Sequence, residues 1–441
     1  MSLRTASPRI LLTGTNPWPV VPRLVVAFRT AGCEVAVLYP NQSHRVREVE
    51  GIGNVFCYNG RSPLHSLKTA IESFDPDIVI PSCDRSVQHL HDLHAICRAQ
   101  DGPSGKTAAL IERSLGSAEA FSIISSRNEL LRIAQSEGIL VPKTAAITSD
   151  SDLQLWSARS APPWVIKADG TWGGQGVRIA HHRADAERFV EEFSRGAGIL
   201  SLLKNLLLNR GRDWVMCDWR NSRHSAVAQS FIQGRPANCA VVCWQGKVLA
   251  SIAVEVIEAR GTTGPATMVQ LVPGSEMTTA AEKIARRLSI SGFFGLDFMI
   301  EEGSGAVYLI EMNPRCTPPC ALPLGQGRNL VAAFYAQLTG HAPLGQQPSI
   351  TQNVIAYSSL PGGADSPGEA MAQDNSIHRD RTGAQAELIQ RRLHPLSRRS
   401  AIGRLVDFLR PKQDHKAAPV IFKTEPLRTS TRKNVAAGTL A

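Results

Sequence analysis

Short apolar runs alternate with amphipathic stretches along the first hundred residues of the chain. Three runs have the pattern of buried strands: Arg9–Thr13, Glu34–Tyr39 and Asp77–Pro81. The pattern between the first two predicts a helix from Pro22 to Ala31. Strands and helices that alternate at these lengths favour a doubly wound parallel sheet. Loops at the carboxyl ends of such strands are the usual ligand-binding positions, and here one of them is Ser82–Arg85.

The pattern changes from about residue 117 onward. Arg127–Glu137 has the spacing of an amphipathic helix that stops before Gly138, and residues 148–160 predict another helix that begins near Ser149. We therefore expect a second domain of mixed helix and strand content after the first one.

Two β-rich stretches, Val165–Ile166 and Val177–Ile179, flank a loop that holds four glycines: Gly170, Gly173, Gly174 and Gly176. Glycines allow backbone N–H groups to converge on an anion without interference from side chains. Lys167 ends the first strand, where its ammonium could lie beside phosphate groups. A flexible surface hairpin explains this loop equally well when the loop is considered alone.

A second hairpin carries acidic and amide side chains inside apolar strands. Asp297 lies in the run Gly295–Ile300, and Glu311 and Asn313 lie in the run Val307–Arg315. On adjacent antiparallel strands Asp297 and Glu311 can face each other, and Asn313 shares the face of Glu311 because side chains alternate. Three oxygen ligands on one face suit Mg²⁺. A buried structural carboxylate is the alternative, although it would be costly without compensation.

The lysine with its glycine-rich loop and the later hairpin, about 140 residues apart, together resemble the ATP-grasp ligases. The string Glu311–Arg315 is most similar to the branch of carbamoyl-phosphate synthetase and biotin carboxylase, and to stand-alone carboxylate–amine ligases. The resemblance implies a Rossmann-like domain followed by a two-lobed ATP-grasp domain. The first domain is expected to span residues 1–116 and the ATP-grasp domain residues 117–345. Within the latter, 117–225 would hold the glycine-rich flap, and 226–345 would hold the adenine hinge and the metal hairpin. A C-terminal extension (346–410) and a disordered basic tail (411–441) would follow.

The same resemblance implies roles for particular residues. Lys167 would hold the ATP phosphates, and the loop of Gly170, Gly173, Gly174 and Gly176 would cover them. Asp297, Glu311 and Asn313 would hold two Mg²⁺ ions, for which Mn²⁺ could substitute. Arg315 would meet the transferred phosphate or the acyl phosphate, because a guanidinium fork suits that group. Arg127 occupies the place of a basic nucleotide contact.

The adenine-binding hinge of the family corresponds to the stretch Val227–Gly234, with Gln229, Phe231 and Ile232 as the nucleotide contacts. The chain departs from the family here. The family commonly has acids near positions 229 and 236, and this chain has Gln229 and Pro236. Backbone atoms near Phe231 and Ile232 remain able to bind adenine.

The resemblance implies activation of a carboxylate by ATP, which gives an acyl phosphate and ADP. An amine then displaces the phosphate. Two alternatives remain open: an ATP-grasp carboxylase or another acyl-phosphate-forming enzyme with a non-amine acceptor, and a non-catalytic nucleotide-binding protein. The expected partners are small-molecule carboxylate and amine substrates, and a homo-oligomer is compatible with the sequence.

Charge is concentrated at the C-terminal end of the chain. The net charge of the 441 residues is +10. Residues 391–441 hold twelve Lys and Arg against three acids, hence +9, so the remainder of the chain sums to +1. A basic tail can bind polyanions, but this one has few aromatic residues for stacking on bases. We therefore favour a solvated tail and expect no nucleic-acid partner for the rest of the chain, with a polyanion site on the tail as the alternative.

Cysteines and histidines offer weaker signals. The nine cysteines are scattered, which favours reduced thiols and a cytoplasmic location, and no apolar run predicts a membrane span or a signal peptide. The spaced pairs Cys239/Cys243 and Cys316/Cys320 are interpreted as small buried hydrophobic residues. The cluster His89, His91 and His94 is interpreted as solvated side chains of one helix.

Overall fold

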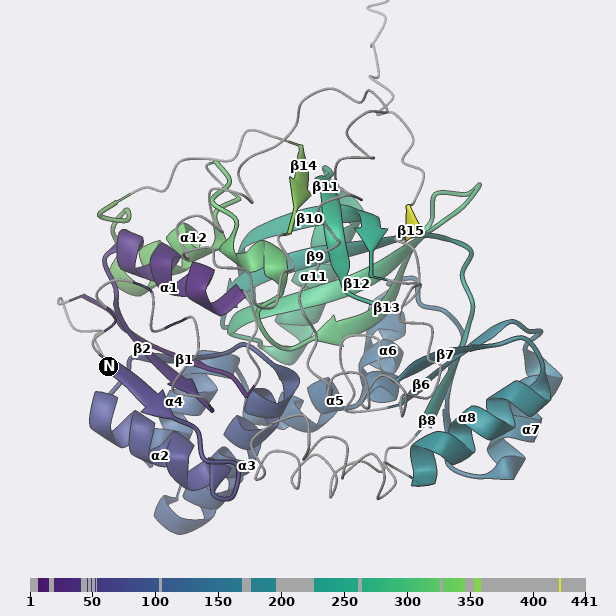
Figure 1. The fold of residues 1–441 in the computed structure, drawn as a ribbon, viewed down its shortest axis with the longest axis horizontal. Coiled ribbons are helices and arrows are strands. Elements are labelled where there is room, and N and C mark those ends of the chain that lie inside the picture. The colour runs from purple at the N-terminus through teal and green to yellow at the C-terminus, as the bar shows by residue number, and fades with distance from the viewer. Residues whose placement is uncertain are drawn as a thin grey trace, which may run out of the picture.

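The protein was analysed as a computed structural model (Figure 1). The structure describes residues 7–15, 20–40, 46, 49, 52, 54–102, 105–168, 176–195, 226–260, 264–325, 328–345, 353–357 and 420–421. Gly170, Gly173 and Gly174 lie outside these residues, as do most of the predicted C-terminal extension and basic tail.

The first domain has a parallel sheet of four strands in the order β3-β2-β1-β4. The strands are β1 (Arg9–Thr13), β2 (Glu34–Tyr39), β3 (Asn54–Cys57) and β4 (Ile78–Pro81). The helices are α1 (Val20–Ala31), α2 (Pro63–Phe74), α3 (Asp84–Asp101) and α4 (Lys106–Leu115). This arrangement confirms the predicted doubly wound sheet. The sequence pattern missed β3, an edge strand of four residues without a fully buried position.

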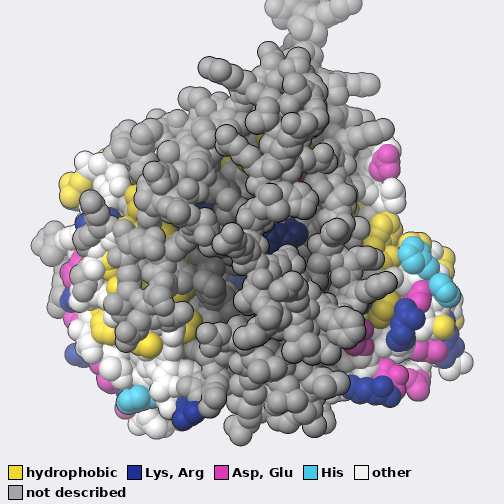
Figure 2. Space-filling model, in the orientation of Figure 1, with side chains coloured by type: hydrophobic (Ala, Val, Ile, Leu, Met, Phe, Trp, Pro, Cys, Tyr) yellow, Lys and Arg dark blue, Asp and Glu magenta, His cyan; other side chains and the backbone are white. Residues whose placement is uncertain are grey.

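The second domain begins with a small lobe, seen on the right of Figure 1. Its antiparallel sheet has the order β5-β8-β6-β7 and consists of β5 (Thr144–Ile147), β6 (Trp164–Ala168), β7 (Val177–Ala180) and β8 (Ala226–Ser230). Helices α7 (Asp150–Arg159) and α8 (Arg183–Arg195) cover one face through Trp156 and Phe193. Figure 2 shows acidic and basic side chains mixed on the outside of this lobe, where α8 carries the i,i+4 pair Arg183–Glu187.

The large lobe is built on an antiparallel sheet in the order β13-β12-β9-β10-β11-β14. Its strands are β9 (Gly234–Trp244), β10 (Lys247–Ala259), β11 (Ala266–Leu271), β12 (Gly292–Glu301), β13 (Val307–Asn313) and β14 (Val354–Ala356). A further strand, β15 (Val420–Ile421), pairs with the end of β10. The predicted basic tail therefore contributes two residues to this sheet.

Helices pack on both faces of the large sheet. One face meets α6 (Arg127–Ser136) and α11 (Ser275–Leu288), whereas α1 and α12 (Leu330–Thr339) lie over the other. Short helices connect these layers: η2 (Ala118–Ala120), α5 (Phe121–Ser125) and η3 (Pro318–Ala321). In the part of the chain that the structure describes, no helix is both long and apolar enough to cross a bilayer.

Strand β12 is fixed from both sides because its side chains alternate between two cores. Leu296 and Phe298 are buried against the α6 and α11 layer. Phe293 faces the other core and lies edge-on to Phe28 of α1 and Phe334 of α12, with ring centroids 6.0 and 5.2 Å away. Burying a phenylalanine contributes about 1.5–3 kcal/mol. The alternation also decides that Asp297 points away from the α6 and α11 core.

The two lobes are joined at residues 231–233, where the chain passes from β8 to β9. The predicted strand Val227–Gly234 thus ends at Ser230, and its last residues form the link. The backbone N–H of Phe231 donates to the carbonyl of Pro163 at 3.4 Å, and the N–H of Glu302 donates to the carbonyl of Gln233 at 2.9 Å. Each end of the link is thereby bound to one lobe.

The first domain meets the large lobe at Gly116, directly after α4. Gly116 forms an isolated β-bridge with Ile290, and its φ is +104°. A Cβ added there would lie 2.3 Å from the carbonyl oxygen of Ser289. The seam between the two parts therefore requires glycine for both its backbone conformation and its close approach.

We predict that Gly116→Ala lowers the free energy of unfolding by about 3 kcal/mol or more, because φ strain and a backbone clash add together. Gly303→Ala is the matched control: φ is +89°, and an added Cβ meets nothing within 4 Å. That variant should cost about 1 kcal/mol, for strain alone. Urea unfolding of both variants measures the difference, and equal losses would show that the seam is not tightly packed.

Candidate functional site

Three polar side chains form a row across neighbouring strands of the large sheet. Asp297 of β12 pairs in register with Glu311 of β13 on one side and with Asn238 of β9 on the other. The structure therefore brings Asp297 and Glu311 together as the alternation of residues predicts. Asn313 lies at the end of β13, opposite Gly295.

Amide groups surround the Asp297 carboxylate. Asn238 Nδ2 donates to Asp297 Oδ1 at 2.6 Å, and Asn313 Nδ2 donates to Asp297 Oδ2 at 2.9 Å. Burial and the nearby charge of Glu311 raise the pKa of Asp297, although these two hydrogen bonds oppose the shift. The ionised form of Asp297 is thus held at a cost that a cation would offset.

Basic side chains surround Glu311 instead. Arg127 Nη2, at the start of α6, donates to Glu311 Oε1 at 3.0 Å, and Lys167 Nζ lies 3.9 Å from Glu311 Oε2. Lys167 Nζ also donates to the carbonyl of Ile310 at 3.2 Å. Burial alone would raise the pKa of Glu311, but Arg127 and then Lys167 outweigh it and hold that pKa below its ordinary value.

Lys167 reaches this site from the small lobe. In β6, Ile166 and Ala168 pack into the core under α7 and α8, so the side chain of Lys167 projects from the opposite face of the sheet. It is nevertheless buried, with 4% of its side chain exposed. Lys167 therefore links the two lobes at the carboxylate of the hairpin.

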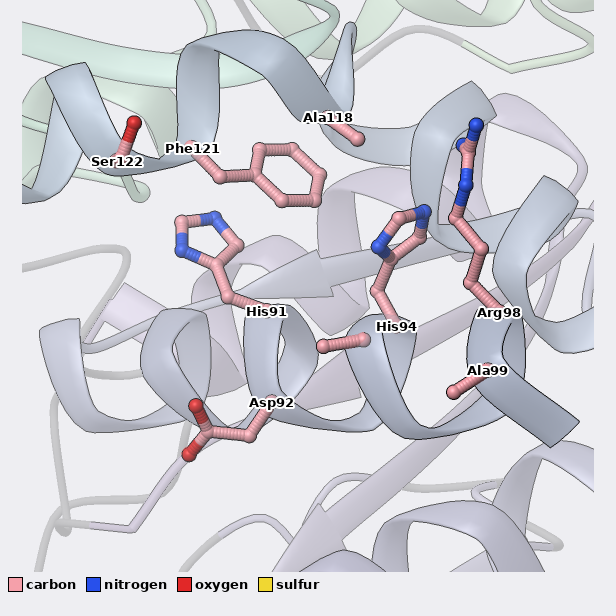
Figure 3. Close-up of a pocket in the computed structure, with 9 residues that line it drawn as sticks. His91, Asp92, His94, Arg98, Ala99, Ala118, Phe121 and Ser122 are labelled. Carbon is pink, nitrogen blue, oxygen red and sulfur yellow. The ribbon is translucent and has the colours of Figure 1, made fainter. Parts of the chain in front are cut away.

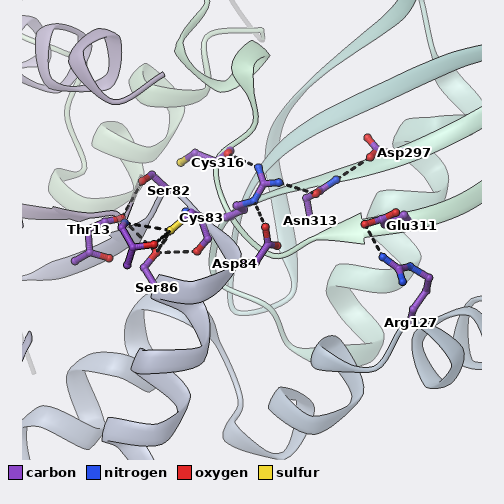
Figure 4. A network of polar contacts seen from close by, with 12 residues as sticks. Thr13, Ser82, Cys83, Asp84, Ser86, Arg127, Asp297, Glu311, Asn313 and Cys316 are labelled. Atoms are coloured by element: carbon purple, nitrogen blue, oxygen red, sulfur yellow. Dashed lines mark hydrogen bonds and ion pairs between the residues drawn. The ribbon is translucent and has the colours of Figure 1, made fainter. Parts of the chain in front are cut away.

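Arg315 connects the hairpin to the first domain. Its Nε donates to Asp84 Oδ2 at 2.7 Å, and its Nη2 donates to Asn313 Oδ1 at 3.0 Å. Asp84 is the first residue of α3. Figure 4 shows Asp84, Asn313 and Asp297 along one path of polar contacts, with Arg127 against Glu311 at its far end. The guanidinium is thereby oriented from both domains.

Sequence patterns missed two members of this site, Asp84 and Asn238. Asp84 lies in the loop Ser82–Arg85, which was predicted to bind ligands. The position of this loop at the end of a strand predicted the ligand-binding segment, but it did not identify Asp84 within it. Asn238 gave no signal, because nothing in the run around it distinguishes an amide in the site from one on the surface.

The other predicted nucleotide contacts lie in the small lobe and in the link between the lobes. Gln229 is buried, and its Nε2 donates to Thr144 Oγ1 at 3.3 Å. Gln229 and Lys167 project from the same face of the small sheet, since both alternate with residues of its core. Phe231 and Ile232 lie in the link between the lobes. The carbonyl of Gly176 accepts from the N–H of Ala168 at 2.8 Å, which closes the base of the glycine-rich hairpin.

The donor set fits a magnesium ion. Among the described residues no group of three or more His, Cys, Asp or Glu side chains could hold a metal ion. The hairpin instead combines two carboxylates with amides, and Mg²⁺ typically takes one or two carboxylates and completes its shell with water and phosphate oxygens. Asn238 Oδ1 is buried and has no hydrogen-bond partner among the described residues, so one oxygen remains for a cation or its water.

The histidine prediction was wrong. His89 and His94 are buried, and the ring of His91 stacks on Phe121 with centroids 4.0 Å apart. Burial, helped by His94, lowers the pKa of His91 to about 4. His94 Nε2 lies 2.7 Å from Glu112. The helix is packed on two sides: His89 contacts Tyr58, whereas His91 and His94 contact Phe121, so the predicted solvated histidines are covered by neighbouring elements.

Two of these histidines, His91 and His94, line a pocket of about 550 Å³ on the first domain (Figure 3). His91, His94 and Arg98 line it from α3, and Phe121 and Ser122 line it from α5. None of its lining residues belongs to the metal hairpin. The cysteine prediction is consistent with the structure, in which Cys239, Cys243, Cys316 and Cys320 are all buried.

Comparison with known proteins gives one family for this region. Residues 129–319 match the family model described as an ATP-grasp domain. The carbamoyl phosphate synthase large chain of Methanothermobacter thermautotrophicus is 22% identical over 238 residues, which are 52% of this chain and 21% of that protein. The chain thus spans about a fifth of the length of this curated relative.

Solved structures share the fold. A biotin carboxylase of Campylobacter jejuni in complex with β,γ-ATP has a TM-score of 0.55 at 15% identity, with 78% of this chain and 73% of that chain covered. An L-amino acid ligase of Bacillus licheniformis has a TM-score of 0.51 at 13% identity, with 77% and 75% covered. At these identities the likeness concerns the fold.

We predict that Arg127→Met destabilises the protein by about 2–4 kcal/mol at pH 7, because it leaves a half-buried carboxylate without its main partner. The lowered pKa of Glu311 sets the pH dependence. This stabilisation is present above the ordinary glutamate pKa and disappears as the pH falls through the lower pKa of the folded state. The loss in stability should therefore shrink below about pH 4. Thermal unfolding between pH 3 and 7 measures it, and a loss independent of pH would contradict the ion pair.

Proposed function

The chain contains an ATP-grasp domain, and from that premise we propose that it is an ATP-dependent ligase. It would activate a carboxylate as an acyl phosphate, which an amine then attacks with release of phosphate. One observation carries the proposal. Lys167 of the small lobe meets the carboxylate of Glu311 in the large lobe, and Glu311 is itself paired in register with Asp297. A donor set of this kind, held between two lobes, suits a magnesium nucleotide.

Each charged residue has a role that fits phosphoryl transfer. Asp297, Glu311 and Asn313 would hold Mg²⁺, which when bound compensates the charge of the phosphate oxygens. Lys167 would supply a further positive charge from the small lobe. Such transfer needs positioning and charge compensation rather than a protein nucleophile. No nucleophile and base pair is required of this site.

Arg315 would bind the carboxylate or the acyl phosphate. A guanidinium is always charged and presents its N–H groups as a rigid fork. Asp84 and Asn313 hold two of its nitrogens, so its orientation is set before a ligand arrives. An acyl substrate would therefore lie where the first domain meets the hairpin.

The adenine would bind at the link between the lobes, through backbone atoms of Phe231 and Ile232. At position 229, where the family commonly has an acid, this chain has the amide side chain of Gln229, and near position 236, where the family has a second acid, it has Pro236. The glycines 170, 173 and 174, with Gly176 at the base of the loop, would cover the phosphates. Arg127 would act as a basic contact near the nucleotide through its place beside Glu311.

Finer points belong to the same proposal. We assign two Mg²⁺ ions to the site, with Mn²⁺ as a substitute, and place the protein in the cytoplasm. Its substrates would be a small carboxylate and an amine, and association into a homo-oligomer is compatible with it. An acyl-phosphate enzyme with a non-amine acceptor is the second candidate, favoured by the structural likeness to biotin carboxylase.

We predict that the protein releases ADP from Mg-ATP only when a carboxylate and an acceptor are both supplied. A coupled ADP assay against paired libraries of acids and amines tests this, with bicarbonate among the acids. Turnover with an amine supports the ligase. Turnover with bicarbonate and no amine would favour the second candidate, and no nucleotide binding at all would exclude both.

We predict that Glu311→Gln keeps the fold but reduces ATP turnover at least about 100-fold, because an amide is a poorer bridging ligand for metal ions than a carboxylate. Glu302→Gln is the control, since Glu302 is exposed in the turn of the same hairpin. The rates of both variants are compared at saturating substrate. Equal rates at ordinary Mg²⁺ concentrations would remove Glu311 from the metal site.

A further inference from the structure

The two carboxylates of the hairpin have different surroundings. Glu311 forms ion pairs with Arg127 and Lys167. The ion pairs found among the described residues include none to Asp297, whose two oxygens accept only from the amides of Asn238 and Asn313. Glu311 is therefore paired directly with two cations, whereas Asp297 is bound by amides and feels the charge of Arg315 without a direct ion pair among the described residues.

Asn238 is held in one orientation by its amino group. Its Nδ2 donates to Asp297 Oδ1 at 2.6 Å and to the carbonyl of Leu296 at 3.3 Å. Both donors of the amide are thus used on β12. This fixes which atom is the nitrogen and leaves Oδ1 on the other side of the group.

Asn238 Oδ1 is buried and lacks a hydrogen-bond partner among the described residues. A buried carbonyl without a partner costs about 1–3 kcal/mol. Such an atom persists where a ligand satisfies it. Since the nearest charged group is the Asp297 carboxylate, the ligand that satisfies both is a cation rather than an N–H donor alone.

We propose that Asn238 is a further oxygen ligand of the metal site, and that the cation lies at the Asp297 end of the row between β9 and β12. The inference rests on the proposed function, because it concerns the magnesium of the nucleotide. It adds a third strand to the site, so that Asn238, Asp297 and Asn313 surround the cation while Glu311 connects it to Arg127 and Lys167.

A different role for Asn238 would be to orient Asp297 through its N–H group alone. The two roles make opposite predictions for Asn238→Asp. If Asn238 is a ligand, the new carboxylate supplies a stronger oxygen donor and restores metal binding. If Asn238 only donates to Asp297, the new charge repels its neighbour and weakens binding further than Asn238→Ala does.

The test is Mn²⁺ binding, followed by electron paramagnetic resonance with a non-hydrolysable ATP analogue present. We expect Asn238→Ala to raise the dissociation constant about 10-fold. Asn238→Asp should bind Mn²⁺ at least as tightly as the wild type. Asn59→Ala is the matched control, since Asn59 is an exposed residue of the first domain whose Oδ1 accepts from the N–H of Arg61. Melting temperatures establish that each variant is folded.

Two results separate the inference from the proposed function. The role of Asn238 would be overturned if the wild type binds Mn²⁺ and Asn238→Ala has the same dissociation constant. It would also be overturned if Asn238→Asp binds Mn²⁺ more weakly than Asn238→Ala. Either result would leave the ligase proposal standing. A wild-type protein that binds no Mn²⁺ with the nucleotide analogue would overturn the proposed function itself.

Discussion

Two acidic side chains directly opposite each other on neighbouring strands repel, and Asp297 and Glu311 are placed in this way inside the protein. Their charges must be compensated by groups from elsewhere in the chain. Arg127 comes from α6, Lys167 from the small lobe, and Arg315 from the end of the hairpin. The repulsion at one register position therefore explains why three separate segments converge there.

The same constraint couples the parts of the molecule. Lys167 of the small lobe lies 3.9 Å from Glu311 of the large lobe, so the position of the small lobe and the charge of the hairpin depend on each other. Arg315 binds Asp84, so the first domain takes part as well. A ligand that changes the charge at the hairpin would alter both contacts. If the proposed substrates bind here, their binding and the relative position of the lobes would be linked in one network.

Local patterns predicted much of this arrangement. The alternation of apolar and polar residues predicted the strands and the pairing of Asp297 with Glu311. Side chains point to opposite faces every second residue, so the register of two strands is determined once one face is buried. Partners far apart in sequence could not be predicted, since Asp84 meets Arg315 only after two domains pack together. The prediction for the histidines of α3 was wrong for the same reason: His91 and His94 are covered by Glu112 of α4 and Phe121 of α5, and His89 is covered by Tyr58, all of them distant in the sequence. The strand β3 was too short and too exposed to give a pattern.

The central claim is that a magnesium nucleotide binds between Lys167 and the hairpin of β12 and β13. Amide hydrogen exchange with and without Mg²⁺ and a non-hydrolysable ATP analogue tests it most directly. The account predicts slower exchange in residues 226–234 and 295–313 when both are present. Slower exchange confined to the first domain, around the pocket of His91 and Phe121, would contradict it.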